Sequence, residues 1–335
     1  MTAQLTATDV GGPALAQAGL TFHRSVDRVL LHRSALSEVF LTDCRAVDDH
    51  TYLAAAQVPP SHAFYTDHLH RSPLVDPMLL MECARQAETY GGHAVLGVPA
   101  GTSFILRDWS LRVDDPAALT RPPGPAEVTM VVETRDHRRV GGALRGVVYD
   151  IGLSLEGEPV GRVHISVGYL SSETYQRLRV GRRGSVPPVS TSVHPRPAGA
   201  PVAPHLVGRR DPGNVVLMDA RTAGGELTAR IRPAVDNPSL FDHAQDHLPG
   251  MVMVEAARQA GLLALNDLHG LSPYRWVLTG MRAEFSSYAE LDAPAFVRVR
   301  PRVPAHHTDR LELTAEFEQD STVIAEAVLT MAMGG

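Results

Sequence analysis

The stretch FDHAQDHLPGMVMVEAARQAG, residues 241–261, combines an apolar helix with charges that such a helix seldom carries. Nearly every residue from 251 to 260 is apolar, which predicts a helix that is covered on almost all sides. Yet Glu255, Arg258 and Gln259 lie within it, three and four residues apart, so they share one face. Because a buried charge is costly unless it is paired, the sequence predicts one polar stripe on a buried helix.

The chain contains the same arrangement twice. Residues 67–87 read DHLHRSPLVDPMLLMECARQA, and Glu82 falls on Glu255 when the chain is shifted by 173 positions. Upstream the shift widens to 175 and then 176, where it aligns two further pairs, His68 with His243 and Arg33 with Arg209. Small loop deletions explain this drift, so the chain is a duplicated domain rather than an array of short repeats.

Each copy carries the same succession of elements around its helix. A β-rich opening (residues 38–58 and 214–233) precedes a loop with Asp-His and then the helix, and three or four strands close the copy. The β-branched runs alternate with polar residues and are broken by Gly, Pro and charged turns, as half-buried antiparallel strands are. The closing strands are predicted within residues 103–113, 126–139 and 142–170 of copy one and 275–290, 295–303 and 310–333 of copy two.

One apolar helix in a strand-rich domain predicts an antiparallel sheet wrapped around that helix. This is the hot-dog architecture, and the expected fold is α+β: a tandem double hot-dog whose units form a pseudo-two-fold dimer. We predict a flexible leader at residues 1–20, hot-dog domains at 21–170 and 205–335, and a linker at 171–204 that is rich in Pro, Gly, Ser and Arg. A solvated linker is the simpler interpretation, and a docking patch for an acidic partner is the alternative, formed by Arg177, Arg179, Arg182 and Arg183.

The bulk composition argues against several classes of protein. A net charge of −6 disfavours a basic nucleic-acid binder. No run approaches the ~18 apolar residues of a membrane span, and the N-terminus lacks the basic and apolar regions of a signal peptide. Cys44 and Cys83 are too few for a disulfide framework and suit a reducing cytoplasm. His243 and His247 have a metal-ligand spacing but no evident third ligand, so we expect neither a metal nor another cofactor.

Two layers of resemblance follow from the helix and its preceding loop. The hydroxyacyl-carrier-protein dehydratases place a His fourteen residues before the acid of the helix, and His68 precedes Glu82 by fourteen residues. More closely, the doubled domain, FLTD in copy one, DHxxDHxPGM in copy two and ARQA in both helices resemble the A-factor biosynthesis family, also called AfsA-like γ-butyrolactone synthases. This closer resemblance covers the chain from about residue 20 to 335.

The resemblance implies an acyltransferase. Such enzymes move a β-ketoacyl group from acyl carrier protein to the hydroxyl of dihydroxyacetone phosphate, and the product leads to a γ-butyrolactone, butenolide or furan signalling molecule. The implied partners are the acylated carrier protein and dihydroxyacetone phosphate, without nucleic acid or membrane; a homodimer stays open. The acyl chain that is transferred also stays open.

The residues and the resemblance together predict the site. Dehydratases carry a small apolar residue where this chain has Arg258 and Arg85, and a guanidinium suits bidentate contact with a phosphate. The first N–H groups of the helix, at Gly250 and Met251, would polarise the thioester carbonyl. The candidate catalytic residues are Glu255, Arg258, His243, Glu82 and His68, and the candidate substrate-binding residues are Arg85, Gln259, Gln86, Gly250 and Met251.

The predicted mechanism uses a carboxylate or an imidazole as base. Glu255, or His243 oriented by it, would take the hydroxyl proton, while Arg258 holds the phosphate or stabilises the developing charge. In paired hot-dogs the His of one unit faces the acid of the other, so His68 would serve Glu255 and His243 would serve Glu82. Copy two keeps Pro-Gly before its helix where copy one has Asp76-Pro77, which favours copy two as the main site.

Three other interpretations remain open. The Glu–Arg pairs would be purely structural if they only tie each helix to its sheet. A dehydratase or thioesterase acting on the same carrier-bound chains would not need the added arginine. A non-catalytic module that binds an acyl chain or a lactone would show no turnover.

Overall fold

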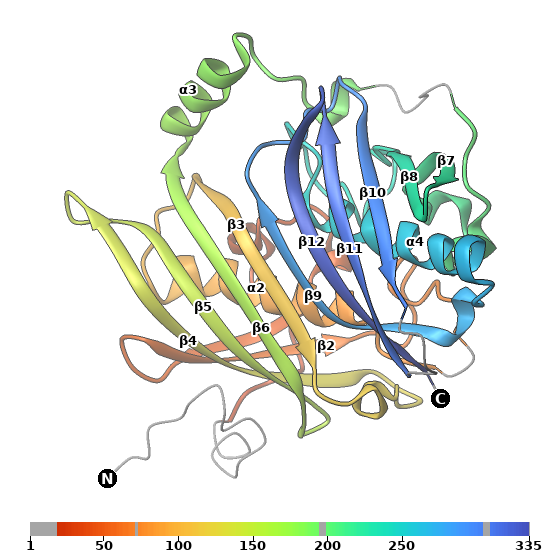
Figure 1. Cartoon of the computed structure of the whole chain (residues 1–335). Helices are drawn as coiled ribbons and strands as arrows, with labels where there is room; N and C mark the ends of the chain where they lie inside the picture. The colour runs from red at the N-terminus through yellow and green to blue at the C-terminus, as the bar shows by residue number, and fades with distance from the viewer. Residues whose placement is uncertain (1–18, 71–72, 194–198, 304–308, 335) are drawn as a thin grey trace. The chain divides into compact units, whose positions relative to one another are not determined.

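The computed structural model describes residues 19–70, 73–193, 199–303 and 309–334, and these group into two compact units (Figure 1). Unit 1 comprises Met1–His62 and Leu74–Leu178, and unit 2 comprises Ala63–Pro73 and Arg179–Gly335. The segment 63–73, which we call the first approach segment, therefore groups with the unit that the second copy forms. Of the predicted leader, residues 1–18 lie outside the described residues.

Unit 1 is one long helix, α2 (Pro77–Ala94), against six strands. In the sheet the strands follow the order β1-β2-β4-β5-β6-β3, and every neighbouring pair is antiparallel. At Gly91 the helix approaches so closely that an added Cβ would lie 2.3 Å from the ring of Tyr52, so only glycine fits there. The strands are β1 (Leu41–Ala46), β2 (Thr51–Val58), β3 (Thr102–Val113), β4 (Ala126–Val140), β5 (Ala143–Leu155) and β6 (Glu158–Ser171).

Unit 2 repeats this plan around α4 (Gly250–His269). Its sheet order, β7-β8-β10-β11-β12-β9, is the same succession of strands as in unit 1, again with antiparallel neighbours. The shared topology confirms the duplication and the double hot-dog, and every strand lies where the alternation predicts it. The strands are β7 (Leu217–Ala223), β8 (Glu226–Ile231), β9 (Trp276–Phe285), β10 (Ala295–Arg302), β11 (Arg310–Gln319) and β12 (Thr322–Met333).

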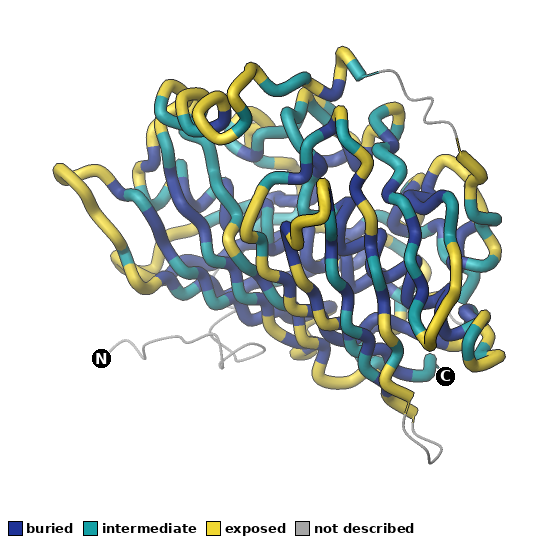
Figure 2. Tube along the Cα trace, turned by 45° about the horizontal axis from the view of Figure 1, so that its top comes forward, coloured by how far each residue is buried: buried dark blue, intermediate teal, exposed yellow. Residues whose placement is uncertain are grey.

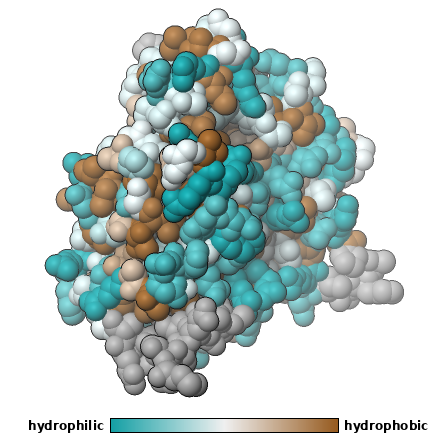
Figure 3. All heavy atoms as spheres, turned by 90° about the vertical axis from the view of Figure 1, so that its left-hand side faces the viewer, coloured by the Kyte–Doolittle hydropathy of each residue, from teal (hydrophilic) through white to brown (hydrophobic). Residues whose placement is uncertain are grey.

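The two long helices lie in the interior of their units. Residues 252–265 of α4 are buried without exception, which confirms a helix covered on nearly all sides. Along the strands, by contrast, buried positions alternate with more exposed ones (Figure 2), as they do in β8 and β11. Hydrophilic side chains cover much of the surface on the side toward which the β4–β5 hairpin projects, with hydrophobic ones scattered among them (Figure 3).

Shorter helical turns connect these elements. The 3-10 turns are Arg28–Leu31, Leu36–Glu38, Pro116–Leu119, Ser190–Ser192, Pro204–Val207, Pro212–Asn214 and Pro273–Arg275. None of the helices in the described part of the chain is both long enough and apolar enough to cross a membrane.

The segment after β6 differs from the irregular linker that its composition suggests. It opens with a three-turn helix, α3 (Ser172–Arg183), in which Glu173 and Arg177 form an i,i+4 ion pair. The linker was predicted from its high content of glycine and proline. The first nine residues of this helix contain neither. Arg179 is buried at 2% exposure, so at least one linker arginine is part of the folded structure rather than an exposed patch.

Candidate functional site

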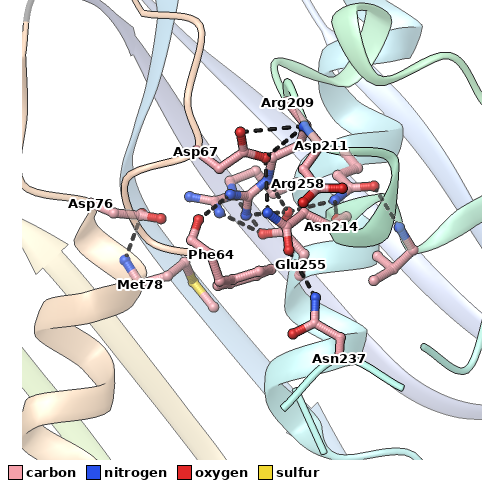
Figure 4. Close-up of polar contacts among 12 residues, drawn as sticks. Phe64, Asp67, Asp76, Met78, Arg209, Asp211, Asn214, Asn237, Glu255 and Arg258 are labelled. Atoms are coloured by element: carbon pink, nitrogen blue, oxygen red, sulfur yellow. Dashed lines mark hydrogen bonds and ion pairs between the residues drawn. The ribbon is translucent and has the colours of Figure 1, made fainter. Parts of the chain in front are cut away.

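The polar stripe of α4 is organised around one carboxylate (Figure 4). Glu255 Oε2 accepts hydrogen bonds from Arg258 Nε at 2.8 Å and Nη2 at 2.6 Å. Glu255 Oε1 accepts from Arg209 Nη2 at 2.7 Å and from Gln259 Nε2 at 2.6 Å. Both oxygens therefore accept from charged or polar donors, and all four residues are buried.

The first approach segment holds Arg209 in place. Arg209 Nη1 donates to the carbonyl oxygen of Phe64 at 2.6 Å, and its guanidinium lies 4.2 Å from the centroid of the Phe64 ring. The carboxylate of Asp67 accepts from the backbone N–H groups of residues 210 and 211 and, at 2.9 Å, from Asn214 Nδ2. Backbone pairing of His68 with Arg209 adds to these contacts. A segment of the first copy thus completes the cluster on the helix of the second.

Copy one builds the same cluster on α2. Glu82 accepts from Arg33, from Arg85 Nε at 2.8 Å and from Gln86 Nε2 at 2.7 Å. Gln86 also donates to the carbonyl of Glu38 at 2.7 Å, just as Gln259 donates to that of Asn214 at 2.8 Å in copy two. The Arg85 side chain is 23% exposed against 6% for Arg258, so the copy-one cluster is the more open of the two.

Electrostatics keeps the copy-one carboxylate ionised. Burial by itself raises the pKa of Glu82, but the charges of Arg33 and Arg85 outweigh burial and hold that pKa well below its usual range. A carboxylate that is stabilised in this way is a weak proton acceptor. The geometry therefore gives Glu82 the role of anchoring two arginines, and the donors around Glu255 have the same arrangement.

The two helices differ at their N-termini. α4 begins at Gly250 after Pro249, and no side chain caps it, so the N–H groups of Gly250 and Met251 form its uncapped first turn. In α2 the Asp76 side chain accepts from the N–H of Met78 at 3.0 Å, so a carboxylate already fills that end. An uncapped helix N-terminus such as that of α4 favours a carbonyl oxygen or an anion through its N–H groups.

The candidate histidines lie on the segments that precede the helices. His243 belongs to residues 242–248, which we call the second approach segment; its Nε2 lies 2.6 Å from Gln245 Nε2 and its Nδ1 3.5 Å from Asp242 Oδ2. His68 lies on the first approach segment beside Arg209, and its ring stacks on that of His70 with 5.2 Å between centroids. Both side chains are half-buried. His68 thus belongs to the unit that contains Glu255.

The second arginine of each cluster was not among the predicted site residues. Arg33 and Arg209 lie about 50 residues before their glutamates, in loops with no periodicity to mark them. The internal alignment did contain the signal, since it placed these two arginines at the same position of the repeat. Asp67 precedes the aligned His68 as Asp242 precedes His243, and it was likewise given no role.

Metal coordination has no support in the described residues. Across them no group of three or more His, Cys, Asp or Glu side chains is arranged to hold an ion. His247 Nδ1 instead lies 2.6 Å from Asp246 Oδ1.

The repeated topology and the repeated cluster define the class of protein, a tandem hot-dog protein with an arginine-bound glutamate on each central helix. The chain belongs to the A-factor biosynthesis hotdog domain family (AfsA), whose model matches residues 15–171 and 190–334. The two matched ranges correspond to the two copies.

Two relatives of this chain carry the same name. A 2-oxo-3-(phosphooxy)propyl 3-oxoalkanoate synthase of Streptomyces virginiae is 35% identical over 90% of this chain and 96% of its own. A synthase of the same name from Streptomyces coelicolor is 30% identical over 82% of each chain. Among solved structures, a bifunctional dehydratase-cyclase domain of ambruticin biosynthesis aligns with 88% of this chain and 95% of its own at 16% identity and a TM-score of 0.45.

Proposed function

We propose that the protein is an acyltransferase that moves a β-ketoacyl group from acyl carrier protein to the hydroxyl of dihydroxyacetone phosphate. The product is the 2-oxo-3-(phosphooxy)propyl 3-oxoalkanoate after which its relatives are named. The observation that carries the proposal is the pair of arginines on a buried glutamate, built once on each central helix.

A purely structural role explains this pair poorly. Replacing a buried Arg–Glu–Arg cluster by well-packed apolar residues is often neutral or stabilising, because the desolvation of the charges offsets their attraction. A fold that needs only stability therefore has little reason to keep two such clusters. The cluster carries one net positive charge, since two guanidiniums share one carboxylate, and a phosphorylated substrate needs a cation of that kind.

In the proposed reaction the thioester carbonyl points its oxygen at the N–H groups of Gly250 and Met251, which stabilise the negative charge of the tetrahedral intermediate. Arg258, anchored by Glu255, binds the phosphate of dihydroxyacetone phosphate. His243 takes the proton of the substrate hydroxyl as its oxygen attacks the carbonyl carbon. The C–O bond forms, the C–S bond breaks, and the proton passes to the leaving carrier thiolate.

His243 rather than Glu255 accepts the proton of the substrate hydroxyl in the proposed reaction. Both oxygens of Glu255 accept from arginines, so a proton would have to displace a charge-assisted hydrogen bond. His243 Nδ1 lies 3.5 Å from Asp242 Oδ2, and its Nε2 lies 2.6 Å from the neutral side chain of Gln245, so a proton on this imidazole displaces no charge-assisted hydrogen bond. We place the reaction in the cytoplasm, where the free thiols of Cys44 and Cys83 would stay reduced.

One assay tests the activity against its rivals. The purified chain is mixed with β-ketoacyl carrier protein, with and without dihydroxyacetone phosphate, while free carrier thiol and product mass are followed. We expect thiol release only with the phosphate, together with the ester product. Thiol release without dihydroxyacetone phosphate would indicate a thioesterase. Loss of water in a parallel reaction with β-hydroxyacyl carrier protein would indicate a dehydratase, and no reaction with any acyl chain would indicate a binding module. His243→Ala should lower turnover about 100-fold or more.

A further inference from the structure

The segment between the two copies carries a buried cation that the reaction itself does not use. Arg179 is 2% exposed at the end of α3, whereas Arg177 and Arg182 on the same helix are exposed. A buried guanidinium is kept only where its donors are satisfied and its charge is matched. The contacts of Arg179 therefore indicate which segments of the chain this part of the linker fixes.

Arg179 joins two segments that lie far apart in the sequence. Its Nε donates to Asp246 Oδ2 at 3.0 Å and its Nη2 to the Asp246 carbonyl at 2.8 Å. Two further bonds, of 2.7 and 2.9 Å, reach the carboxylate of Glu290, and the guanidinium lies 4.2 Å from the ring centroid of Tyr288. All three guanidinium nitrogens donate, and Asp246 belongs to the second approach segment.

A second linker residue, Ser190, forms hydrogen bonds with Gln245, which precedes Asp246 in the second approach segment. The N–H of Ser190 donates to the Gln245 carbonyl at 2.7 Å, and the N–H of Gln245 donates to Ser190 Oγ at 3.1 Å. The side chain of Gln245 in turn contacts His243 at 2.6 Å. On the other side the N–H of Leu248 donates to the Ala289 carbonyl at 2.9 Å. Three of the residues just before α4 are thus fixed from outside the segment.

We propose that Arg179 is a positioning residue for the transfer reaction: with Ser190, it fixes the second approach segment so that His243 stands at a set place before the N-terminus of α4. The proposal rests on the function proposed above, in which His243 takes the substrate proton. It also assigns a role to the arginine-rich linker, whose buried member acts within the chain rather than on an acidic partner.

The expected effect separates positioning from substrate binding. Arg258 lies on α4 itself and is anchored by Glu255, whereas Arg179 contacts Asp246, Glu290 and Tyr288. Loss of Arg179 should therefore displace the base and leave the phosphate contact intact. A misplacement of about 1 Å costs up to roughly 100-fold in rate, so the change belongs in kcat rather than in KM for dihydroxyacetone phosphate.

The test compares Arg179→Met and Arg179→Lys in the full chain, with Arg177→Met as the matched control on the exposed face of the same helix. We expect Arg179→Met to lower kcat about 10- to 100-fold, with KM for dihydroxyacetone phosphate within about twofold of the parent. Arg179→Lys should recover part of the loss, and Arg177→Met should match the parent. The pH dependence of kcat should also change in Arg179→Met, because a displaced imidazole loses its orienting contacts.

The outcomes separate this proposal from the one it rests on. If His243→Ala stays fully active, the proposed base is wrong whatever Arg179 does. If His243→Ala is inactive while folded Arg179→Met keeps its kcat, or changes only KM, the positioning role is refuted. Should both Arg179 variants fail to fold, Ser190→Ala decides, because it removes a single bond to Gln245: a several-fold drop in kcat supports the proposal, and an unchanged kcat refutes it.

Discussion

At the scale of single residues, Arg258 and Arg85 offer a matched comparison of the two clusters. A lysine at either position keeps the charge but loses the planar fork that contacts Glu255 or Glu82 with two nitrogens. Because the N-terminus of α4 is uncapped and Asp76 fills that of α2, we expect Arg258→Lys to lower kcat/KM roughly 100-fold and Arg85→Lys to lower it several-fold at most.

Steady-state kinetics with varied dihydroxyacetone phosphate measures both variants. Equal losses would indicate two equivalent half-sites, which the difference between the helix ends argues against. A larger loss for Arg85→Lys would move the main site to α2.

Glu88 provides a pH-dependent readout of the interior of unit 1. It is buried on α2; its Oε2 accepts from Thr89 Oγ1 at 2.9 Å, and its Oε1 has no hydrogen-bond partner among the described residues. Burial raises its pKa from 4.5 to about 7, against the opposing effects of Thr89 and Arg85. Because the folded-state pKa lies above the unfolded one, stability is fully present below about pH 4.5 and is lost as pH rises through 7.

The substitution Glu88→Gln should remove this dependence. At about 1.4 kcal/mol per pKa unit, the variant gains roughly 3 kcal/mol over the parent above pH 7. Urea unfolding between pH 5 and 8 measures the free energy of both proteins, with Glu158→Gln, exposed on β6, as the control. Parallel profiles for parent and Glu88→Gln would show that this carboxyl does not titrate in that range.

At the scale of elements, the first approach segment acts through Asp67. Its carboxylate accepts from two backbone N–H groups beside Arg209 and from Asn214. In Asp67→Asn an amide donor would face the amide donor of Asn214, and an unsatisfied buried donor costs about 1–3 kcal/mol. We expect that loss in the free energy of unfolding, together with a fall in transfer activity as Arg209 shifts.

The control for this prediction is Asp219→Asn. That carboxylate also accepts a backbone N–H, from Ala200 at 2.8 Å, and pairs with Arg230, but it is 35% exposed. Its loss should change stability by about 0.5 kcal/mol or less. Chemical denaturation of both variants makes the comparison, and an Asp67→Asn variant as stable and active as the parent would remove the segment from the site.

The elements also show which features can be read from sequence. The strands and central helices were predictable because each is long and follows one hydrophobic period, as β11 does over Arg310–Gln319. The stripe of Glu255, Arg258 and Gln259 was predictable because helical geometry fixes neighbours three and four residues apart. Arg33 and Arg209 were not, since their approach to the glutamates depends on how a loop folds back over about 50 residues.

At the scale of the whole molecule, duplication sets where the parts of the site come from. The sequence predicts domains that follow one another along the chain, at 21–170 and 205–335. The compact units instead assign residues 63–73 to unit 2, in which Phe64 and Asp67 accept hydrogen bonds from residues 209–214. No hydrophobic period in the sequence marks the grouping of this segment with unit 2, so it is visible only in the structure.

Because residues 63–73 belong to unit 2, we predict that the second copy is incomplete by itself. A fragment of residues 179–335 lacks the carbonyl of Phe64 that accepts from Arg209 and the carboxylate of Asp67 that holds the adjoining turn. Buried donors left without partners cost about 1–3 kcal/mol each, more for a charged group, which is a large part of the total stability of a domain. We expect the fragment to melt at a lower temperature than the intact chain and to show no transfer.

A matched fragment that contains the missing segment tests the cause. Adding residues 63–70 through a flexible Gly-Ser linker should raise the melting temperature of the fragment, because it restores both acceptors, whereas the same addition with Phe64→Ala and Asp67→Asn should raise it less. Thermal unfolding followed by circular dichroism measures all three proteins. If the bare fragment melts cooperatively at the temperature of the intact chain, Arg209 does not need the first copy, and the second copy is a self-sufficient unit.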